Sequence, residues 1–339
     1  MTIYKPWIGR AVRLFFLLAL LLCAFFLYSL VRIRETASVR FSPTTEVQEM
    51  PLYKHVARLS VAIGSRSIFE YDKLMAAKEY ILACLKAMGY RPALQDYSYQ
   101  GRIFSNITAS LPGKTHPEEV VVIGAHFDTV IGSPGADDNA SGVATLLEMC
   151  RLLKNAAPER TLEMVFFTLE EPPLFRSEYM GSLVYARAAK KEKKKIIAML
   201  SLEMLGYYSD QHGKQSFPAP LMNLLYPSTP NFIAVVGDLS SRSLAQRVTS
   251  SLRQKQGIMV ESLSTFSFLP GIDFSDHRSF WKMGYPAVMI TDTAFYRNPN
   301  YHTEEDKPET LDFPRMSRLL EALVATAQDL TNSAPRKVP

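Results

Sequence analysis

The chain has 339 residues, 47% of them hydrophobic and 11% aromatic, which suits a packed domain and excludes a disordered protein. Its formal net charge of +5 arises in the first 40 residues, where six Lys or Arg accompany one acid. The rest of the chain is therefore formally neutral, and it lacks the basic footprint of a nucleic-acid-binding protein.

An uncharged apolar run occupies residues 14–31, and its 18 residues approach the roughly 20 that cross a bilayer core. Three basic residues precede it, as in a cytoplasmic N-terminus, and no A-x-A cleavage site follows. We therefore expect a cytoplasmic segment 1–13, a transmembrane anchor 14–31 in contact with lipid, a linker 32–50 and one domain at 51–333. The domain would lie outside the cytoplasm, in the periplasm or extracellular space, and would be secreted if the run were cleaved.

The domain is predicted to alternate between strands and helices. A helix is expected over residues 66–90 and a hairpin over 90–111. Later strands are expected at 120–123, 162–169, 196–202, 232–236 and 287–290. Later helices are expected at 142–153, 181–189, 241–254, 275–283 and 313–330, with loop-rich stretches at 206–230 and 257–274. This order predicts an α/β fold with a mostly parallel central sheet flanked by helices.

The cysteines do not indicate a thiolate metal site. Cys23 lies in the apolar run, and neither Cys84 nor Cys150 belongs to a C-x-x-C pair. A Cys84–Cys150 disulfide stays open, but two buried free thiols are the preferred interpretation because free Cys is commonly buried.

Acidic and histidine side chains follow the predicted strands at five separate places. Singly, each has an ordinary explanation, such as a helix N-cap or a surface histidine. Together they are significant, because ligands of open α/β sheets bind outside the carboxyl ends of the strands. The side chains concerned are His126 with Asp128, the pair Asp137 and Asp138, the pair Glu170 and Glu171, Glu203, and His302.

These residue types suit two zinc ions. Zinc binds imidazole nitrogen and carboxylate oxygen, and a carboxylate can bridge paired metals about 3.5–4 Å apart. Three carboxylates and one hydroxide balance two dications if both imidazoles are neutral. Asp128 is two residues after His126, so both side chains point to one side of a strand and Asp128 can orient the imidazole. In the Glu170–Glu171 pair, one carboxylate can bind metal while its neighbour acts as a general base.

Six segments, in order, resemble the zinc aminopeptidase family of bacterial leucyl aminopeptidase and aminopeptidase S, whose relatives include glutamate carboxypeptidase and the glutaminyl cyclases. The segments are GAHFDTV, PGADDNASG, FFTLEEP, SLEMLGY, FSDHRSFWKMGYPAVMITDT and YHTEEDKPETLD. The resemblance covers residues 50–331 and implies a three-layer zinc exopeptidase fold. It also implies a role for each site residue: ligands of two zinc ions for His126, Asp138 (bridging), Glu171, Glu203 and His302, general base for Glu170, and orientation of His126 for Asp128.

The sequence departs from the family pattern at two places and contains a second candidate for one zinc ligand. Glu203 is longer than the Asp found in many members, so the second zinc is the less certain one. Pro-Pro-Leu-Phe follows Glu171 where many members have a glycine-rich turn, which can alter the pocket beside the base. His277 competes with His302 as the last ligand, but the resemblance places it beside the metals, and an N-cap is its ordinary role.

The predicted function is a membrane-anchored, two-zinc aminopeptidase that hydrolyses N-terminal residues from peptide substrates. Two alternatives stay open at this point. One is a cyclotransferase that uses a single zinc, as in the glutaminyl cyclases, and the other is an ectodomain without catalytic activity. The sequence decides neither the oligomeric state nor the side-chain preference.

Overall fold

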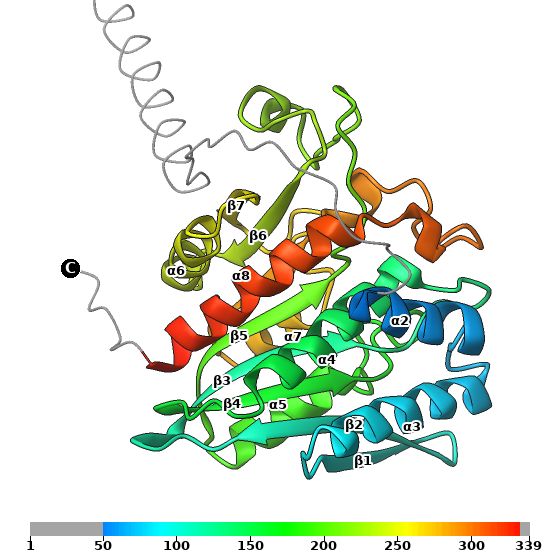
Figure 1. Cartoon of the computed structure of the whole chain (residues 1–339), viewed down its shortest axis with the longest axis vertical. Helices are drawn as coiled ribbons and strands as arrows, with labels where there is room; N and C mark the ends of the chain where they lie inside the picture. The colour runs from blue at the N-terminus through cyan, green and yellow to red at the C-terminus, as the bar shows by residue number, and fades with distance from the viewer. Residues whose placement is uncertain (1–49, 333–339) are drawn as a thin grey trace, which may run out of the picture.

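The computed structural model describes residues 50–332, and its elements run along the chain in an alternating pattern (Figure 1). The helices are α2 (Pro51–Ala57), α3 (Tyr71–Ala87), α4 (Gly142–Leu153), α5 (Gly181–Lys191), α6 (Arg242–Arg253), α7 (His277–Lys282) and α8 (Phe313–Asn332). The strands are β1 (Ala93–Tyr99), β2 (Arg102–Leu111), β3 (His116–His126), β4 (Arg160–Phe167), β5 (Lys195–Glu203), β6 (Phe232–Asp238), β7 (Met259–Thr265) and β8 (Ala287–Thr291).

The strands form one eight-stranded sheet in the order β1-β2-β4-β3-β5-β8-β6-β7. The middle of the sheet, β4-β3-β5-β8, is parallel, as predicted. The β1–β2 hairpin joins β4 antiparallel, and β6 joins β8 antiparallel, so the sheet is mixed, with four of its seven neighbouring pairs parallel. Parallel neighbours place their carboxyl ends at one edge, and this edge is where β3, β4 and β5 deliver the site residues.

Helices cover both faces of the sheet, which gives three layers (Figure 1). One apolar cluster joins α2, α3, α4, α6 and α8 to one face through buried residues such as Leu147 and Leu323. A second cluster packs α5 and α7 onto the opposite face through Tyr185 and Phe280. All eight residues of β4 are buried, because both faces of this strand are covered.

The structure corrects three of the predicted elements. The helix expected over 66–90 begins only at Tyr71, because Gly64 at φ +82° and the segment after it form a loop. Ahead of that loop, α2 and a π-helical turn at Arg58–Ile63 were not predicted. The stretch 257–274 was expected to be loop-rich, yet it contains β7. The strand was not predicted because Glu, Ser and Thr occupy buried positions at which apolar residues usually indicate a strand.

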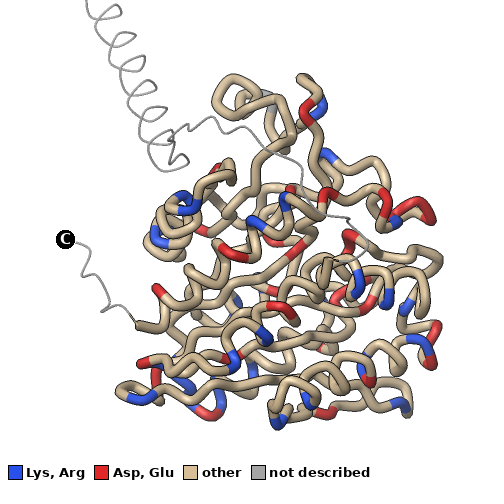
Figure 2. Tube along the Cα trace, in the orientation of Figure 1, with Lys and Arg blue, Asp and Glu red and all other residues tan. Residues whose placement is uncertain are grey.

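Within residues 50–332, no helix has the length and apolar character needed to span a membrane. The predicted anchor at 14–31 and the preceding segment lie outside the described residues. Cys84 and Cys150 are both free thiols, and of the two only Cys150 is fully buried. Figure 2 shows acidic and basic positions interspersed over the described body.

Candidate metal centre

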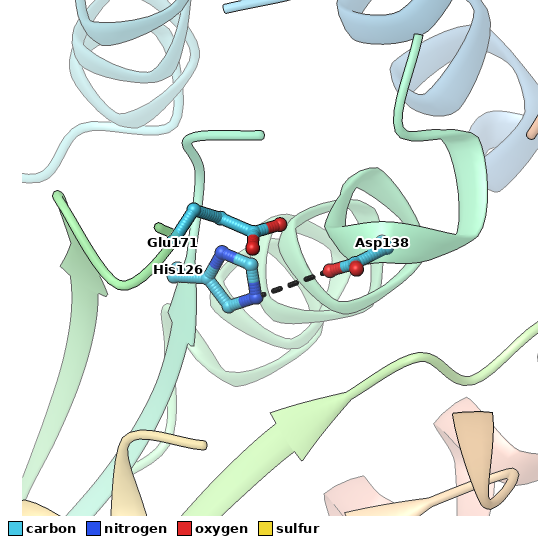
Figure 3. A group of neighbouring side chains, drawn as sticks. All are labelled: His126, Asp138 and Glu171. Carbon is cyan, nitrogen blue, oxygen red and sulfur yellow. Dashed lines mark ion pairs between the residues drawn. The ribbon is translucent and has the colours of Figure 1, made fainter. Parts of the chain in front are cut away.

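The predicted site residues converge at the carboxyl edge of the parallel strands. His126 ends β3 and Glu203 ends β5, whereas Glu170 and Glu171 follow β4 directly. Asp138 lies in the turn between β3 and α4, and its side chain faces His126 (Figure 3). Four segments far apart in the sequence thus place carboxylates and an imidazole together, and each of these side chains is buried.

Asp138 is shared by two groups of donor atoms. Its Oδ1 lies 3.4 Å from Nε2 of His126, and the same Nε2 is 3.3 Å from Oε2 of Glu203. Its Oδ2 lies 3.2 Å from Nε2 of His302, which is 3.3 Å from Oε2 of Glu171. We call these the His126 trio and the His302 trio, each with one imidazole and two carboxylates. Asp138 is the member that the trios have in common.

In each trio, the distances from the imidazole nitrogen to the two carboxylate oxygens, 3.2–3.4 Å, fit neighbouring donors of a tetrahedral zinc ion. Zinc holds nitrogen and oxygen donors at about 2.0–2.1 Å, which places neighbouring donors of a tetrahedron about 3.3–3.4 Å apart. Both ring nitrogens of His126 and Oε1 of Glu171 are buried without a hydrogen-bond partner in the described chain. Buried polar atoms are rarely left unpaired, so these atoms are consistent with ligands for a cation.

The pKa values of the cluster reflect a dense negative charge. Burial opposes ionisation of Asp138, but the neighbouring imidazoles of His126 and His302 outweigh it and lower its pKa well below the usual range. Burial and the neighbouring Asp138 raise the pKa of Glu171 to about 8. Burial also raises the pKa of Glu203 and, more strongly, that of Glu170. Cations bound here would take the place of the protons that these carboxyls retain.

Glu170 differs from its neighbour in its surroundings. Its backbone N–H donates to Asp128, and within residues 50–332 its carboxylate takes part in neither trio. Glu171, by contrast, faces His302. The adjacent acids therefore point to different partners, and only Glu171 joins a trio. This leaves the carboxylate of Glu170 available for proton transfer.

Asp128 has a second task besides the one predicted. Its Oδ1 lies 3.6 Å from Nδ1 of His126, on the side of the ring opposite the trio. Its two oxygens also accept the backbone N–H groups of Glu170 and Glu171, at 3.1 and 3.0 Å. Asp128 therefore connects the end of β3 to the turn after β4 and fixes both of the segments that carry site residues.

Ser275 and Asp306 support the site but were not predicted. Oγ of Ser275 donates a 2.7 Å hydrogen bond to Oε2 of Glu203 and so orients that carboxylate. The buried carboxylate of Asp306 accepts the backbone N–H groups of Asp137 and Asp138, at 2.9 and 3.0 Å. The only signal for Asp306 was its place four residues after His302, within a segment already quoted for the resemblance.

Arg66 is the third support that the sequence did not reveal. Its guanidinium is fully buried and donates to the carbonyl oxygens of Phe127, Pro134 and Gly135, at 2.7, 2.6 and 2.9 Å. These carbonyls bracket the loop that leads from β3 to Asp138. Burial lowers the pKa of Arg66 to about 10, so the side chain still carries its charge at neutral pH.

His277 lies apart from both trios. Its Nε2 bonds to the carbonyl oxygen of Ile272 at 2.8 Å, and its ring meets the ring of Trp281 edge-on at 4.5 Å. Burial lowers the pKa of His277 to about 4, so it is a neutral structural residue. His302 is the histidine that reaches the site, and its ring stacks on Tyr301 at 3.7 Å.

A mostly apolar pocket adjoins the His126 trio. It opens beside Glu203 and Tyr301 and has an empty volume of about 760 Å³, part of which is open to solvent. The sheet contributes its floor, and the loops around 215–226, 271–274 and 293–296 form its walls. The Pro-Pro-Leu-Phe segment reaches this region, because the ring of Phe175 contacts the ring of Phe274 in the pocket wall at 5.8 Å.

Comparison with known proteins gives a consistent assignment. Residues 106–327 match the sequence model of peptidase family M28. An uncharacterised protein of Escherichia coli, YfbL, is 39% identical over 292 residues, which cover 83% of this chain and 89% of that protein. Leucine aminopeptidase 1 of Phaeosphaeria nodorum is 31% identical over 67% of this chain, and the match spans 55% of that protein's length.

The fold is shared with a solved zinc aminopeptidase from Bacillus subtilis, with a TM-score of 0.66 at 16% identity over 88% of this chain and 98% of that one. The predicted resemblance is thereby confirmed, together with the hydrolase class of the predicted enzyme. From residue 106 to residue 327, the chain belongs to peptidase family M28.

Proposed function

We propose that this chain is a two-zinc aminopeptidase, which removes N-terminal residues from peptides. The observation that carries the proposal is the sharing of Asp138 between two complete donor trios. The names of a curated relative and of a solved neighbour, both aminopeptidases, support an exopeptidase that acts at the N-terminus.

His126, Asp138 and Glu203 would hold one zinc, and His302, Asp138 and Glu171 the other. When bound, the two ions supply a Lewis acid that polarises the scissile carbonyl and lowers the pKa of water. Two dications also balance the four carboxylates of the cluster, with Glu170 counted among them. Such a balance matters because a buried excess charge is costly.

Glu170 performs the proton transfer in this proposal. Its carboxylate takes a proton from the attacking water and delivers it to the leaving amine. In the metal-free protein, burial raises the pKa of Glu170 well above its ordinary value. Asp128 holds the backbone of Glu170 in place, so it acts as a positioning residue.

The experiment is hydrolysis of aminoacyl p-nitroanilides by the full chain in detergent, with zinc content measured in the same samples. Glu170→Gln should bind zinc as the wild type does, and its kcat should fall about 10²- to 10⁴-fold because the proton acceptor is lost. Glu118→Gln is the control, since Glu118 is exposed at the start of β3, far along the strand from the site. A Glu170→Gln variant with full activity would refute the role of the general base.

The two alternative functions are less well supported. A cyclotransferase with one zinc would not need the His302 trio, and an ectodomain without catalytic activity would need neither trio. One zinc per chain, with cyclisation of N-terminal glutamine and no hydrolysis, would establish the cyclotransferase instead.

We also propose that residues 14–31 anchor the chain in a membrane with the hydrolase outside the cytoplasm. The support is the uncharged run of 18 residues and the basic residues before it. The full chain should stay in the membrane fraction after carbonate extraction, and protease added outside the cytoplasmic membrane should digest the hydrolase. Release of a shortened chain into the soluble fraction would contradict an uncleaved anchor.

A further inference from the structure

A continuous wall of aromatic rings leads outward from the metal centre. The ring of His302 stacks on Tyr301 at 3.7 Å, and the ring of Tyr301 lies 5.5 Å from that of Phe295. Phe295 contacts Phe274 at 6.0 Å, and Phe274 contacts Phe175 at 5.8 Å. The three middle rings line the pocket, and Phe175 packs against this lining from outside. The wall therefore begins at a proposed zinc ligand and ends beyond the pocket.

The outer end of this wall carries a positive charge. The guanidinium carbon of Arg176 lies 5.2 Å from the ring centre of Phe175 and 5.1 Å from that of Phe274. Nη2 of Arg176 donates a 2.5 Å hydrogen bond to Asp273, and Nε of Arg278 donates to the same carboxylate at 2.8 Å. Two guanidinium groups thus share one carboxylate, so these three side chains have a net charge of +1. Arg176 is the more exposed of the two cations, with 43% of its side chain accessible to solvent.

We propose that Arg176 binds a carboxylate on the leaving side of the substrate, and that the enzyme therefore favours short peptides with a free C-terminus. The inference rests on the proposed aminopeptidase function and narrows its substrate class. Arg176 is then a specificity-determining residue that takes no part in the chemical step. An acidic side chain at the same place in the peptide is a second source of this carboxylate, and the experiment separates the two sources.

The proposed mechanism places the leaving residues on this side of the metals. Glu170 delivers a proton to the leaving amine, so the part of the peptide beyond the scissile bond begins next to Glu170. From Glu171 the chain enters a turn, in which the N–H of Phe175 donates to the carbonyl oxygen of Glu171 at 3.1 Å. Arg176 directly follows this turn. The leaving residues and the guanidinium therefore lie on the same side of the site.

The distances suit the carboxylate of a tripeptide. One turn of chain rises about 5.4 Å, so Arg176 begins roughly one turn from Glu171, and its side chain extends roughly 6–7 Å more. An extended peptide spans about 3.3–3.6 Å per residue, so the C-terminal carboxylate of a tripeptide lies roughly 7 Å beyond the scissile carbonyl. A hydrogen bond of about 3 Å closes the remaining gap. The carboxylate of a dipeptide stays next to the metals.

The guanidinium is already held in place before a substrate binds. The two rings and Asp273 restrain Arg176, so little side-chain freedom is lost when a carboxylate binds. A guanidinium can stack on aromatic faces and still bind a carboxylate through two parallel hydrogen bonds. Arg176 has a φ of +63°, which residues other than glycine seldom adopt, so the backbone of this turn does not favour arginine. These contacts fit a side chain that binds a ligand.

The experiment compares the zinc-loaded full chain with Arg176→Gln on Leu-Gly-Gly and on Leu-Gly-Gly-amide, which has no carboxylate. We expect the wild type to have the higher kcat/KM on Leu-Gly-Gly. Arg176→Gln should lower the ratio of the two values about 5- to 30-fold, mainly through KM, because an exposed hydrogen bond between charged groups is lost. Arg176→Lys keeps the charge and should recover part of the ratio. An equal loss on both peptides would show that Arg176 only supports the fold, and would overturn the inference.

Arg187→Gln is the matched control. Arg187 is exposed on α5, and its partner Glu178 is exposed as well. This variant removes one positive charge from the surface and should leave the ratio unchanged. A drop in the ratio as large as that of Arg176→Gln would mean that net charge, and not a contact with Arg176, sets the preference, and the inference would be wrong.

A second pair of peptides identifies the source of the carboxylate. We expect Leu-Gly-Glu-amide to gain less over Leu-Gly-Gln-amide than Leu-Gly-Gly gains over its amide. If only the pair with the acidic side chain shows a preference, the proposed recognition of a free C-terminus is wrong. Binding gives a readout without turnover: in the Glu170→Gln background, calorimetry should detect tighter binding of Leu-Gly-Gly than of its amide, and adding Arg176→Gln should abolish the difference.

Leucine p-nitroanilide separates this inference from the proposed function. A wild type that hydrolyses it, but hydrolyses Leu-Gly-Gly and the amide equally well, overturns the role of Arg176 and leaves the aminopeptidase standing. A wild type that hydrolyses none of these compounds overturns the aminopeptidase and the inference with it. The preference is measured on the wild type alone, so the proposal stays refutable if Arg176→Gln does not fold. If Arg176→Gln folds and keeps the wild-type ratio, Arg176 is structural and the inference is wrong.

Discussion

Replacing Arg66 by Met should destabilise the loop that carries Asp138, although Arg66 belongs to neither donor trio. Its guanidinium donates to three carbonyl oxygens at 2.6–2.9 Å and is fully buried. Met keeps much of the length and the apolar stem but donates no hydrogen bond. Three buried carbonyls then lose their donor, and the acids nearby lose a compensating positive charge.

The size of the effect follows from these contacts. Each hydrogen bond from a charged donor contributes about 1.5–3 kcal/mol to the free energy of unfolding. Met does not bury a charge, and this gain offsets part of the loss of the three hydrogen bonds. Removal of one partner from a buried charge network costs about 3–5 kcal/mol. At roughly 2 °C per kcal/mol for a domain of this size, Tm should fall by about 6–10 °C. The zinc affinity should fall about 10- to 100-fold, as for other partners that support metal ligands.

Differential scanning calorimetry on metal-free and zinc-loaded protein measures the first quantity, and competition with a chelator measures the second. Arg187→Met is the matched control, because Arg187 is exposed on α5 and its partner Glu178 is exposed as well. Surface pairs contribute about 0–1 kcal/mol, so its Tm should change by no more than about 2 °C. If Arg66→Met matches Arg187→Met in Tm and zinc affinity, the structural role given to Arg66 is wrong.

Two further predictions concern metal binding. Ser275→Ala removes the 2.7 Å hydrogen bond to Glu203 and should weaken the binding of one zinc about 10- to 100-fold, while the other zinc stays tightly bound. A two-step zinc titration measures both affinities. Equal weakening of both sites would count against this assignment. In the metal-free protein, Asp138 and Glu171 outweigh burial and raise the pKa of His302 to about 10, and burial raises that of Glu171 to about 8. Both groups hold protons at pH 7, so zinc uptake should release protons and the affinity should rise from pH 6 to pH 8. Calorimetry in two buffers of different ionisation enthalpy counts the released protons; a count of zero would contradict the ligand set.

The arrangement of the site could be anticipated because strand ends are visible in the sequence. His126, Glu171 and Glu203 each follow a run of buried apolar residues, and the carboxyl ends of parallel strands share one edge. The assignment of His302 over His277 came from resemblance to a family, and of these two histidines the structure places His302 beside Asp138. The roles themselves stay predictions until they are tested in solution.

The supports could not be predicted, because they depend on contacts between distant segments. Arg66 meets the backbone of residues 127–135, and Asp306 meets Asp137 and Asp138 across nearly half of the chain. The sequence around Arg66 and around Asp306 does not indicate which distant backbone segment will contact the side chain. The failure to predict β7 has a related cause, since Glu261 breaks an apolar pattern where it faces the pocket.

The zinc content of the purified full chain tests the central claim most directly. Elemental analysis by inductively coupled plasma mass spectrometry should give two zinc ions per chain in the wild type and in Glu170→Gln. His302→Ala should bind one, because its loss disrupts only the trio that contains Glu171. Full hydrolytic activity in a wild-type chain that binds one zinc or none would contradict the account.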